Sequence, residues 1–117
     1  MLAPYRVLDL TDERGALAGF LLAALGAEVV SVEPAEGSRI RAMGPFVGDV
    51  PGAERSLWHL AYNRGKRSVT IDSVDLAALA GQSDVLLECG ALPIDLAARV
   101  ARRGVSVVDA RADGLDQ

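Results

Sequence analysis

The sequence is short of the residues that mark several common classes of protein. It contains one cysteine, one histidine and one lysine, and aromatic residues make up only 4% of its 117 positions. A single cysteine excludes a disulfide within the chain and fits a reducing compartment, so we expect a cytoplasmic protein. One cysteine and one histidine also fall short of the several ligands, at defined spacing, that a zinc site needs. No metal is therefore expected.

Long apolar runs and an excess of basic charge are also missing. The longest apolar run, residues 16–27, is too short to cross a bilayer and is interrupted by glycines. No basic leader typical of a signal peptide precedes the first strand-like segment. The formal net charge of −4 argues against binding nucleic acid, which depends on many lysines and arginines. We expect neither a membrane nor a nucleic acid among the partners.

Aliphatic residues are abundant, and they are arranged in an alternating pattern. Half of the residues are hydrophobic, which is enough for the core of a small domain. Residues 6–10 and 28–33 have the composition of strands. Between them, the Ala- and Leu-rich residues 15–25 predict a helix that ends at Gly26. A strand, a helix and a second strand in this order indicate a βαβ unit and hence a parallel sheet.

The rest of the chain continues this alternation after a glycine- and proline-containing excursion over residues 35–53. A helix is expected over residues 54–62, with Leu57, Leu60 and Ala61 facing the core. Further elements are expected as strands at 68–72, 84–88 and 105–109 and as helices at 74–80 and 94–103.

These elements predict an α/β fold with a mostly parallel sheet flanked by helices. We expect one domain over residues 1–109 and a polar tail over residues 110–117. The excursion is a candidate rim for a binding site, because long loops in compact domains are often functional.

A dinucleotide site is the first function that a βαβ unit suggests. Glu33 ends the second strand, where a ribose-binding acid would lie, but the G-x-G-x-x-G motif is absent. Thr11 and Asp12 are candidate N-caps of the first helix. Asp12 and Glu13 stand where a pyrophosphate would dock, and they favour the helix but repel an anion. We therefore expect Glu33 to be a solvated strand end.

Two further features carry possible chemistry. The segment 63–68, Asn-Arg-Gly-Lys-Arg-Ser, holds three of the 12 basic residues. Such a turn can hold a phosphate, although charged turns are more often simply solvated, and the residues leave both interpretations open. Cys89 follows a strand at the carboxyl edge where parallel sheets bind ligands. Nothing brings His59, the only candidate base, to it, so a small buried cysteine is favoured.

Four segments of the chain occur together in a distinctive order: residues 7–11 (VLDLT), 25–34 (LGAEVVSVEP), 63–70 (NRGKRSVT) and 84–88 (DVLLE). Together they resemble the N-terminal region of the family III CoA-transferases (the CaiB/BaiF family). The resemblance implies a Rossmann-like large domain, of which this chain would be an incomplete part, and coenzyme A (CoA) or an acyl-CoA as ligand. It also implies a homodimer of interlocked protomers or a complementary chain that carries the rest of the fold.

The resemblance also implies, position by position, which residues contact CoA. They form a first-loop pair, a turn segment and a pair after the strand at 84–88: Arg14 and Gly15; Tyr62, Asn63, Arg64, Gly65, Lys66 and Arg67; and Cys89 and Gly90. The last pair departs from the family's usual Asn followed by an aromatic residue. Pro34 stands where some members have a CoA-binding arginine.

The resemblance implies no catalytic residue in this chain. The transferases' nucleophilic aspartate, which forms an acyl-enzyme, lies downstream of the matching region, as do the catalytic His and Asp of the related racemases. We therefore expect the CoA-binding N-terminal portion of a CoA-transferase-like enzyme, a fragment or split subunit that is inactive alone and exposes apolar surface. The alternatives are an acyl-CoA racemase of the same family and a non-catalytic nucleotide-binding or interaction module.

Overall fold

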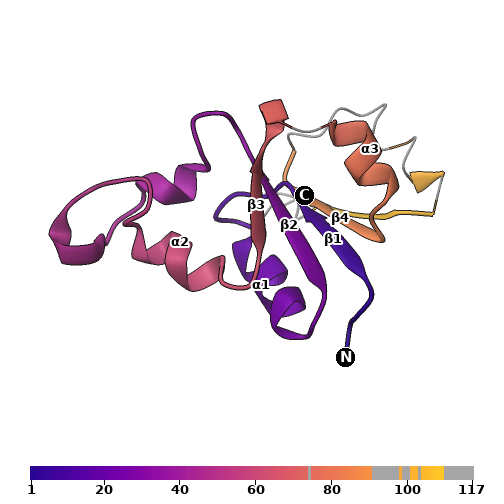
Figure 1. The fold of residues 1–117 in the computed structure, drawn as a ribbon, viewed down its shortest axis with the longest axis horizontal. Coiled ribbons are helices and arrows are strands. Elements are labelled where there is room, and N and C mark those ends of the chain that lie inside the picture. The colour runs from indigo at the N-terminus through magenta and orange to yellow at the C-terminus, as the bar shows by residue number, and fades with distance from the viewer. Residues whose placement is uncertain (74, 91–97, 99–100, 103, 110–117) are drawn as a thin grey trace, which may run out of the picture.

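A five-stranded sheet forms the centre of the computed structural model, which describes residues 1–73, 75–90, 98, 101–102 and 104–109. The strand order is β3-β2-β1-β4-β5, and every neighbouring pair is parallel. This arrangement confirms the predicted α/β fold (Figure 1). The strands are β1 (Arg6–Asp9), β2 (Glu28–Glu33), β3 (Arg67–Thr70), β4 (Val85–Glu88) and β5 (Ser106–Asp109).

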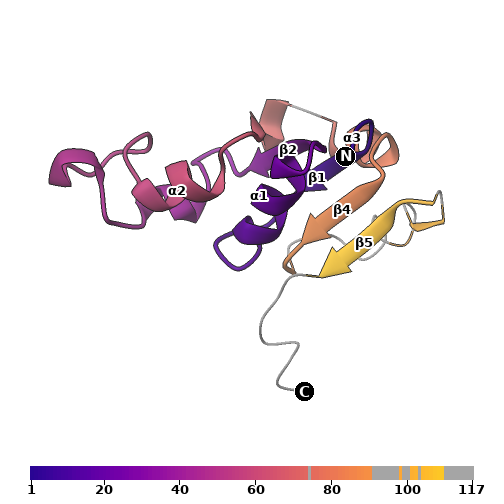
Figure 2. The same ribbon diagram turned by 90° about the horizontal axis from the view of Figure 1, so that it is seen from below.

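Helices cover both faces of the sheet, which explains the nearly continuous apolar runs of the central strands. Successive strand residues point to opposite faces. One face packs against α1 (Ala16–Ala24) and the other against α3 (Leu76–Gly81), so that the two helices lie on opposite sides in Figure 2. The buried residues are Val7, Ala27, Val29 and Leu87 on the α1 side, and Leu8, Val32, Ala80, Leu86 and Val105 on the α3 side.

The first helix begins later than its expected caps. Gly15 is the N-cap of α1, and no side chain caps the helix there. The expectation that Thr11 or Asp12 would cap it is wrong, because the Thr11 hydroxyl donates to Asp9 and the Asp12 carboxylate accepts from Arg14. The expected end at Gly26 is correct, since this glycine has the left-handed φ of 103°.

The outward face of α1 is apolar. Leu17, Leu21 and Leu25, spaced four residues apart, are 52%, 51% and 44% exposed. Side chains with this spacing lie on one side of a helix. The helix therefore buries Ala16 and Gly19 and partly buries Leu22, while presenting a row of leucines to the outside.

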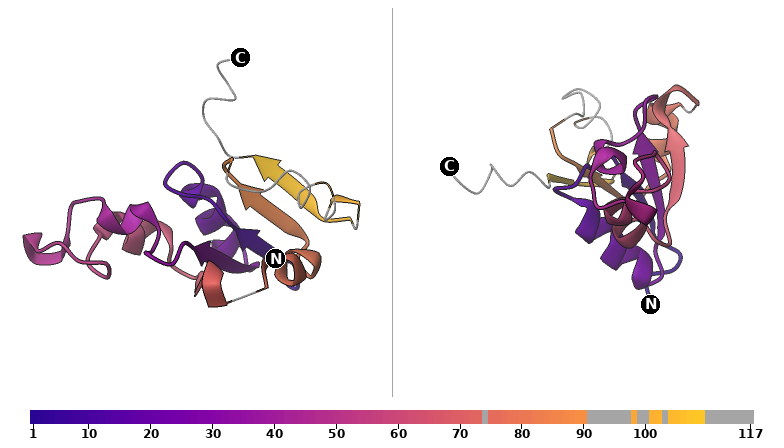
Figure 3. Two further views of the ribbon diagram at one scale, coloured as in Figure 1. Left: turned by 90° about the horizontal axis from the view of Figure 1, so that it is seen from above. Right: turned by 90° about the vertical axis from the view of Figure 1, so that its left-hand side faces the viewer.

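The excursion after β2 lies beyond β3, the strand at one edge of the sheet (Figures 1 and 3). It contains two 3₁₀ turns, Arg39–Ala42 and Val47–Asp49, and then α2 (Leu57–Tyr62). An isolated antiparallel bridge between Phe46 and Ser56 closes it. The part of the chain from Phe46 to Ser56 is thus a loop whose two ends are held together.

The predicted orientation of α2 is wrong. Leu57 and Leu60 are each 43% exposed and Ala61 is exposed, whereas Trp58 and His59 are half-buried. The reason lies in the helix start: the buried Ser56 accepts a hydrogen bond from the His59 amide, so the helix begins at 57 instead of 54. The position of the helix start determines which side of α2 faces the protein interior. Trp58 and His59 therefore lie on the side where Leu57 and Leu60 were expected.

The remaining predicted elements differ mainly at their ends. The third strand stops at Thr70, because a 3₁₀ turn, Ile71–Ser73, follows it. Asp75 caps α3 by accepting from the Ala78 amide, so this helix begins at Leu76. The helix expected at 94–103 lies mostly outside the described residues, and the tail at 110–117 entirely so. None of the helices that the structure describes is long and apolar enough to span a membrane.

Candidate functional site

A cavity of about 1010 Å³ lies at the carboxyl ends of β1, β2 and β4. Ligands of open parallel sheets bind at this edge, because the loops there leave a crevice between neighbouring strands. The excursion forms its outer wall, as its role as a candidate rim predicts. The apolar part of the lining includes Leu10, Val32, Ala42, Phe46, Ile71 and Leu76. The charged part consists of Asp12, Arg14, Glu33, Glu36, Arg39 and Arg41.

The arginines of this cavity are paired with carboxylates. Arg14 donates to Asp12 at 2.9 Å and to the Cys89 carbonyl at 3.2 Å. Its hydrogen bond lowers the pKa of Asp12 to about 2. Arg39 is 66% exposed and is bound to Glu13, with Asp12 at 3.7 Å. A phosphate entering the cavity would therefore have to share these guanidinium groups with their present partners.

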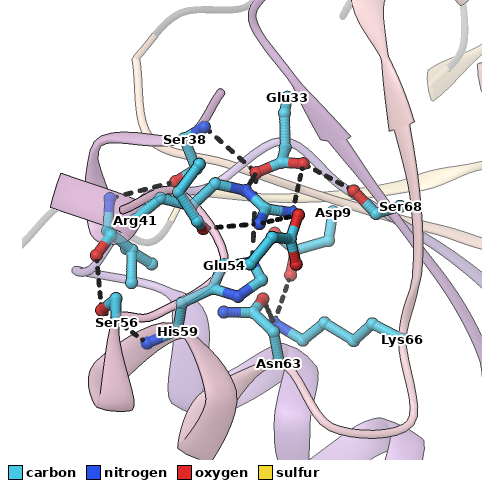
Figure 4. A network of polar contacts seen from close by, with 12 residues as sticks. Asp9, Glu33, Ser38, Arg41, Glu54, Ser56, His59, Asn63, Lys66 and Ser68 are labelled. Atoms are coloured by element: carbon cyan, nitrogen blue, oxygen red, sulfur yellow. Dashed lines mark hydrogen bonds and ion pairs between the residues drawn. The ribbon is translucent and has the colours of Figure 1, made fainter. Parts of the chain in front are cut away.

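Glu33 is the centre of a polar network on the inner side of the excursion (Figure 4). Its carboxylate accepts from Arg41 at 2.6 and 3.0 Å, from the Ser38 amide at 3.1 Å and from the Ser68 hydroxyl at 2.6 Å. The residue is only 5% exposed. The expectation of a solvated strand end is wrong, because the arginine supplied by the excursion allows this charge to be buried.

His59 lies beside this network. Its Nε2 is 4.0 Å from a Glu33 oxygen, and the side chain is 16% exposed. Burial is the main effect that lowers the pKa of His59, and the nearby Arg41 acts in the same direction. The imidazole is therefore neutral at pH 7.

Lys66 takes a different position from the one that a cationic turn suggests. Its ammonium group is 2.9 Å from the Asp9 carboxylate, and both side chains are only 2% exposed. It also donates to the Asn63 side-chain oxygen at 3.0 Å and to the Ala16 carbonyl at 3.2 Å (Figure 4). The prediction that Lys66 contacts a ligand remains a prediction, but the ammonium group faces the interior.

The other residues of the turn lie near its surface, against α1. Tyr62 packs edge-on to Phe20, with ring centroids 6.5 Å apart, and the Arg64 guanidinium lies 5.4 Å from the centroid of the same Phe20 ring. Gly65 adopts the left-handed φ of 82° that this tight turn requires. Arg64 is exposed and takes part in no ion pair among the residues that the structure describes, so its charge is available to an anion.

Arg67 is also accessible, and it belongs to the first position of β3. Its side chain is 78% exposed and lies 3.6 Å from Glu28, which is a long and solvated ion pair. Such pairs contribute little to stability and are easily exchanged for another partner.

The structure brings together two of the three predicted groups of contacts. Arg14 and Cys89 both line the cavity and are joined by a hydrogen bond. Gly15 is buried beside Thr11, and Gly90 turns the chain after β4 with a φ of 97°. The segment 62–67 is not part of the cavity lining.

Cys89 is 8% exposed, as expected for a small buried cysteine. Burial raises the pKa of its thiol, so the group is protonated at neutral pH and is a weak nucleophile. Across the described part of the chain, no three side chains of the types His, Cys, Asp and Glu are grouped as a metal site would need.

Sequence reasoning missed the residues that hold the site in place, namely Asp9 and Arg41. A signal for the first was present, because Asp9 interrupts the apolar run of β1, and a charge buried in a central strand needs a partner. Arg41 gave no comparable signal, since nothing in the sequence of the excursion shows that it folds back on Glu33.

Comparison with known proteins finds similarity to one family of enzymes. The family model for CoA-transferase family III matches residues 2–91. Subunit BbsE of succinyl-CoA:(R)-benzylsuccinate CoA-transferase from Thauera aromatica is 41% identical over 68 residues, which cover 58% of this chain and 17% of that protein. The probable fatty acyl-CoA transferase Rv3272 of Mycobacterium tuberculosis is 38% identical over 91 residues, covering 72% and 23% respectively.

Solved structures give the same result. A crystal structure of Rv3272 superposes with a TM-score of 0.64 at 37% identity, over 85% of this chain and 30% of that one. A CAIB/BAIF family protein from Brucella suis superposes with a TM-score of 0.64 at 31% identity, over 88% and 28%. The chain thus spans about a fifth of the length of the curated relatives it matches. With most of its residues matched by the family model, the chain belongs to CoA-transferase family III.

Proposed function

We propose that this chain is the CoA-binding N-terminal portion of an enzyme that moves CoA between an acyl-CoA and a carboxylic acid. The observation that carries the proposal is the cavity at the carboxyl edge of the sheet, with Arg14 and Cys89 in its wall. Both positions are ones at which the family resemblance implies a contact with CoA. Membership of the family supports the reaction class.

The chemical character of the cavity suits the ligand. CoA combines anionic phosphates with an adenine ring and a long, mostly uncharged arm, and the cavity combines guanidinium groups with an apolar lining. Arg14 and the exposed Arg39 can contact phosphate oxygens by sharing their present carboxylate partners. Arg64, on the turn against α1, adds an exposed guanidinium group, which lies over the Phe20 ring.

In this proposal the chain binds and orients CoA, while the bond-making group lies elsewhere in the enzyme. The nucleophile would be an aspartate outside these 117 residues, which forms an acyl-enzyme with the substrate. Buried carboxylates such as Asp9 and Glu33 have no such role, because each is already neutralised by a cation and shielded from solvent.

Titration calorimetry with CoA tests the proposal. We expect binding to the unmodified protein and a loss of about tenfold or more in affinity for Arg14→Ala and for Arg64→Ala, since each change removes a charge-assisted hydrogen bond to phosphate. Arg102→Ala, which removes another exposed arginine, is the matched control and should bind CoA normally. Absence of CoA binding at millimolar concentration would refute the proposal.

A transfer assay with the purified chain tests the division of labour. We expect no transfer of CoA from an acyl-CoA to a carboxylate acceptor. Turnover by homogeneous material would show that the chain contains its own nucleophile.

A further inference from the structure

The buried pair Asp9–Lys66 connects two segments that are far apart in the sequence. Asp9 is the last residue of β1, and Lys66 belongs to the turn between α2 and β3, 57 positions later. Each side chain is 2% exposed. A buried pair of this kind is seldom retained for stability alone, because the cost of removing two charges from water offsets most of their attraction.

The ammonium group of Lys66 has no hydrogen left for a ligand. It carries three N–H donors, and three acceptors surround it: the Asp9 carboxylate, the Asn63 side-chain oxygen and the Ala16 carbonyl. Gly19 closes the site from α1, since a Cβ at that position would come within 2.8 Å of the Lys66 nitrogen and still closer to the Asp9 carboxylate. The packing leaves no space for a phosphate.

Each end of the pair fixes a segment for which a CoA contact is proposed. The second Asp9 oxygen accepts from the Thr11 amide at 2.9 Å and from the Thr11 hydroxyl at 2.5 Å, which sets the start of the loop carrying Arg14. Thr11 in turn lies so close to Gly15 that a Cβ there would be 2.5 Å from it. At the other end, Lys66 holds Asn63 and so the turn that carries Arg64.

We propose that Asp9 and Lys66 are positioning residues, which together hold the loop after β1 and the turn after α2 in register for CoA, and that Lys66 does not touch the ligand. This inference rests on the proposed function, because it assigns the pair a role in CoA binding. In this proposal Lys66 makes no direct contact with CoA and acts by holding the turn that carries Arg64. Asp9, which lies in no predicted contact group, becomes as important for affinity as the lysine.

Calorimetry with CoA on the whole protein separates the two roles. The variants are Asp9→Asn, Lys66→Met and the double variant, and the control is Val29→Ala, which lowers stability in the core on the α1 side without touching the pair. All are measured well below their unfolding temperatures. If the pair contributed only to stability, its variants would weaken CoA binding no more than Val29→Ala does.

The positioning role predicts that each single variant loses about tenfold in affinity for CoA. The double variant should bind no more weakly than the single variant with the lower affinity, because the two residues act as one unit. Direct contact predicts that Lys66→Met alone weakens binding, while Asp9→Asn leaves it unchanged or tightens it by freeing the lysine. That result would overturn the proposal, as would normal affinity in all variants.

Two safeguards keep the outcomes distinct. If Lys66→Met does not fold because it leaves Asp9 unpaired, Asp9→Asn still decides between the roles, and the double variant contains no unpaired charge. If the unmodified protein does not bind CoA, the proposed function fails. If it binds CoA and Asp9→Asn binds equally well, only the positioning role fails.

Discussion

Glu33 is buried at the end of β2, yet it is ionised at neutral pH. Burial by itself raises the pKa of this carboxyl, but the hydrogen bonds from Arg41 and Ser68 outweigh that effect and lower it from 4.5 to about 2. A carboxylate with such a folded-state pKa stabilises the protein at every pH above its ordinary value. The stabilisation is lost as the pH falls from about 4.5 to 2.

We predict that Glu33→Gln lowers the free energy of unfolding at pH 7 by on the order of 3 kcal/mol and makes it less dependent on pH below 4.5. Urea unfolding at pH 7, 5 and 3 measures both effects. Asp12 and Glu13 also have lowered pKa values, so part of the acid sensitivity will persist in the variant. The exposed Glu36→Gln is the control. Equal loss of stability at pH 7 and pH 3 would contradict the role of the Glu33 charge.

Gly19 provides a second test at a single position. We predict that Gly19→Ala destabilises the protein by about 1–3 kcal/mol, because its methyl group would overlap the Asp9–Lys66 pair. In an open helix position the same change would stabilise by about 1 kcal/mol. Thermal unfolding gives the sign directly, and Ala18→Gly on the exposed side of α1 serves as the reference. A stabilised Gly19→Ala protein would mean that this side of the helix is loosely packed.

The start of α2 depends on the side chain of Ser56. The Ser56 oxygen accepts from the His59 amide and lies 2.7 Å from the Met43 carbonyl and 3.0 Å from the Ile40 carbonyl, so one hydroxyl both caps the helix and ties it to the first 3₁₀ turn. The residue is fully buried.

We predict that Ser56→Ala costs about 1–3 kcal/mol, combining the loss of a cap with a hydrogen bond left unmade in the interior. Denaturant unfolding measures the loss, and the exposed Ser106→Ala is the matched serine change. Similar stability of the two variants would show that α2 is positioned by its aromatic contacts instead.

The leucine row of α1 has its own consequence. Leu17, Leu21 and Leu25 are about half exposed on one side of the helix, and contiguous apolar surface of this kind promotes association. We predict concentration-dependent association in sedimentation velocity, and a shift towards monomer for the variant Leu21→Lys with Leu25→Lys. Because these side chains are exposed, the variant should keep its far-UV circular dichroism spectrum. A monomeric unmodified protein at all concentrations would contradict this prediction.

Elements of the sheet were predictable because their signals are local. The apolar runs of β1, β2 and β4, bounded by turn residues, give the strands and their parallel arrangement, and Gly26 gives the end of α1. The inward side of α2 was not predictable in this way. Ser56 fixes it through carbonyl groups of the excursion, which the pattern of leucines in the helix does not reveal.

The candidate site was predictable to a smaller extent. Arg14 and Cys89 meet at the cavity, as their places after two neighbouring strands suggest. The sequence shows that the turn over residues 63–68 is basic. It does not show that the Lys66 side chain points inward while those of Arg64 and Arg67 point outward. That division depends on Asp9, a residue in another part of the chain.

At the scale of the whole molecule, the fold described here corresponds to a minor part of the related enzymes. The chain spans between 17% and 23% of the curated relatives reported above. The leucine row of α1 is an exposed apolar surface against which the remainder of such an enzyme would pack.

The two buried carboxylates also bear on how the chain folds. The first strand, the first helix and the second strand look like a self-contained unit. However, Glu33 is paired with Arg41, eight positions later, and Asp9 is paired with Lys66, 57 positions later. A structure made of this unit alone would have to bury Asp9 and Glu33 without these cations, which is costly. We therefore predict that the segment from β1 to β3 opens and closes as one cooperative unit in hydrogen exchange.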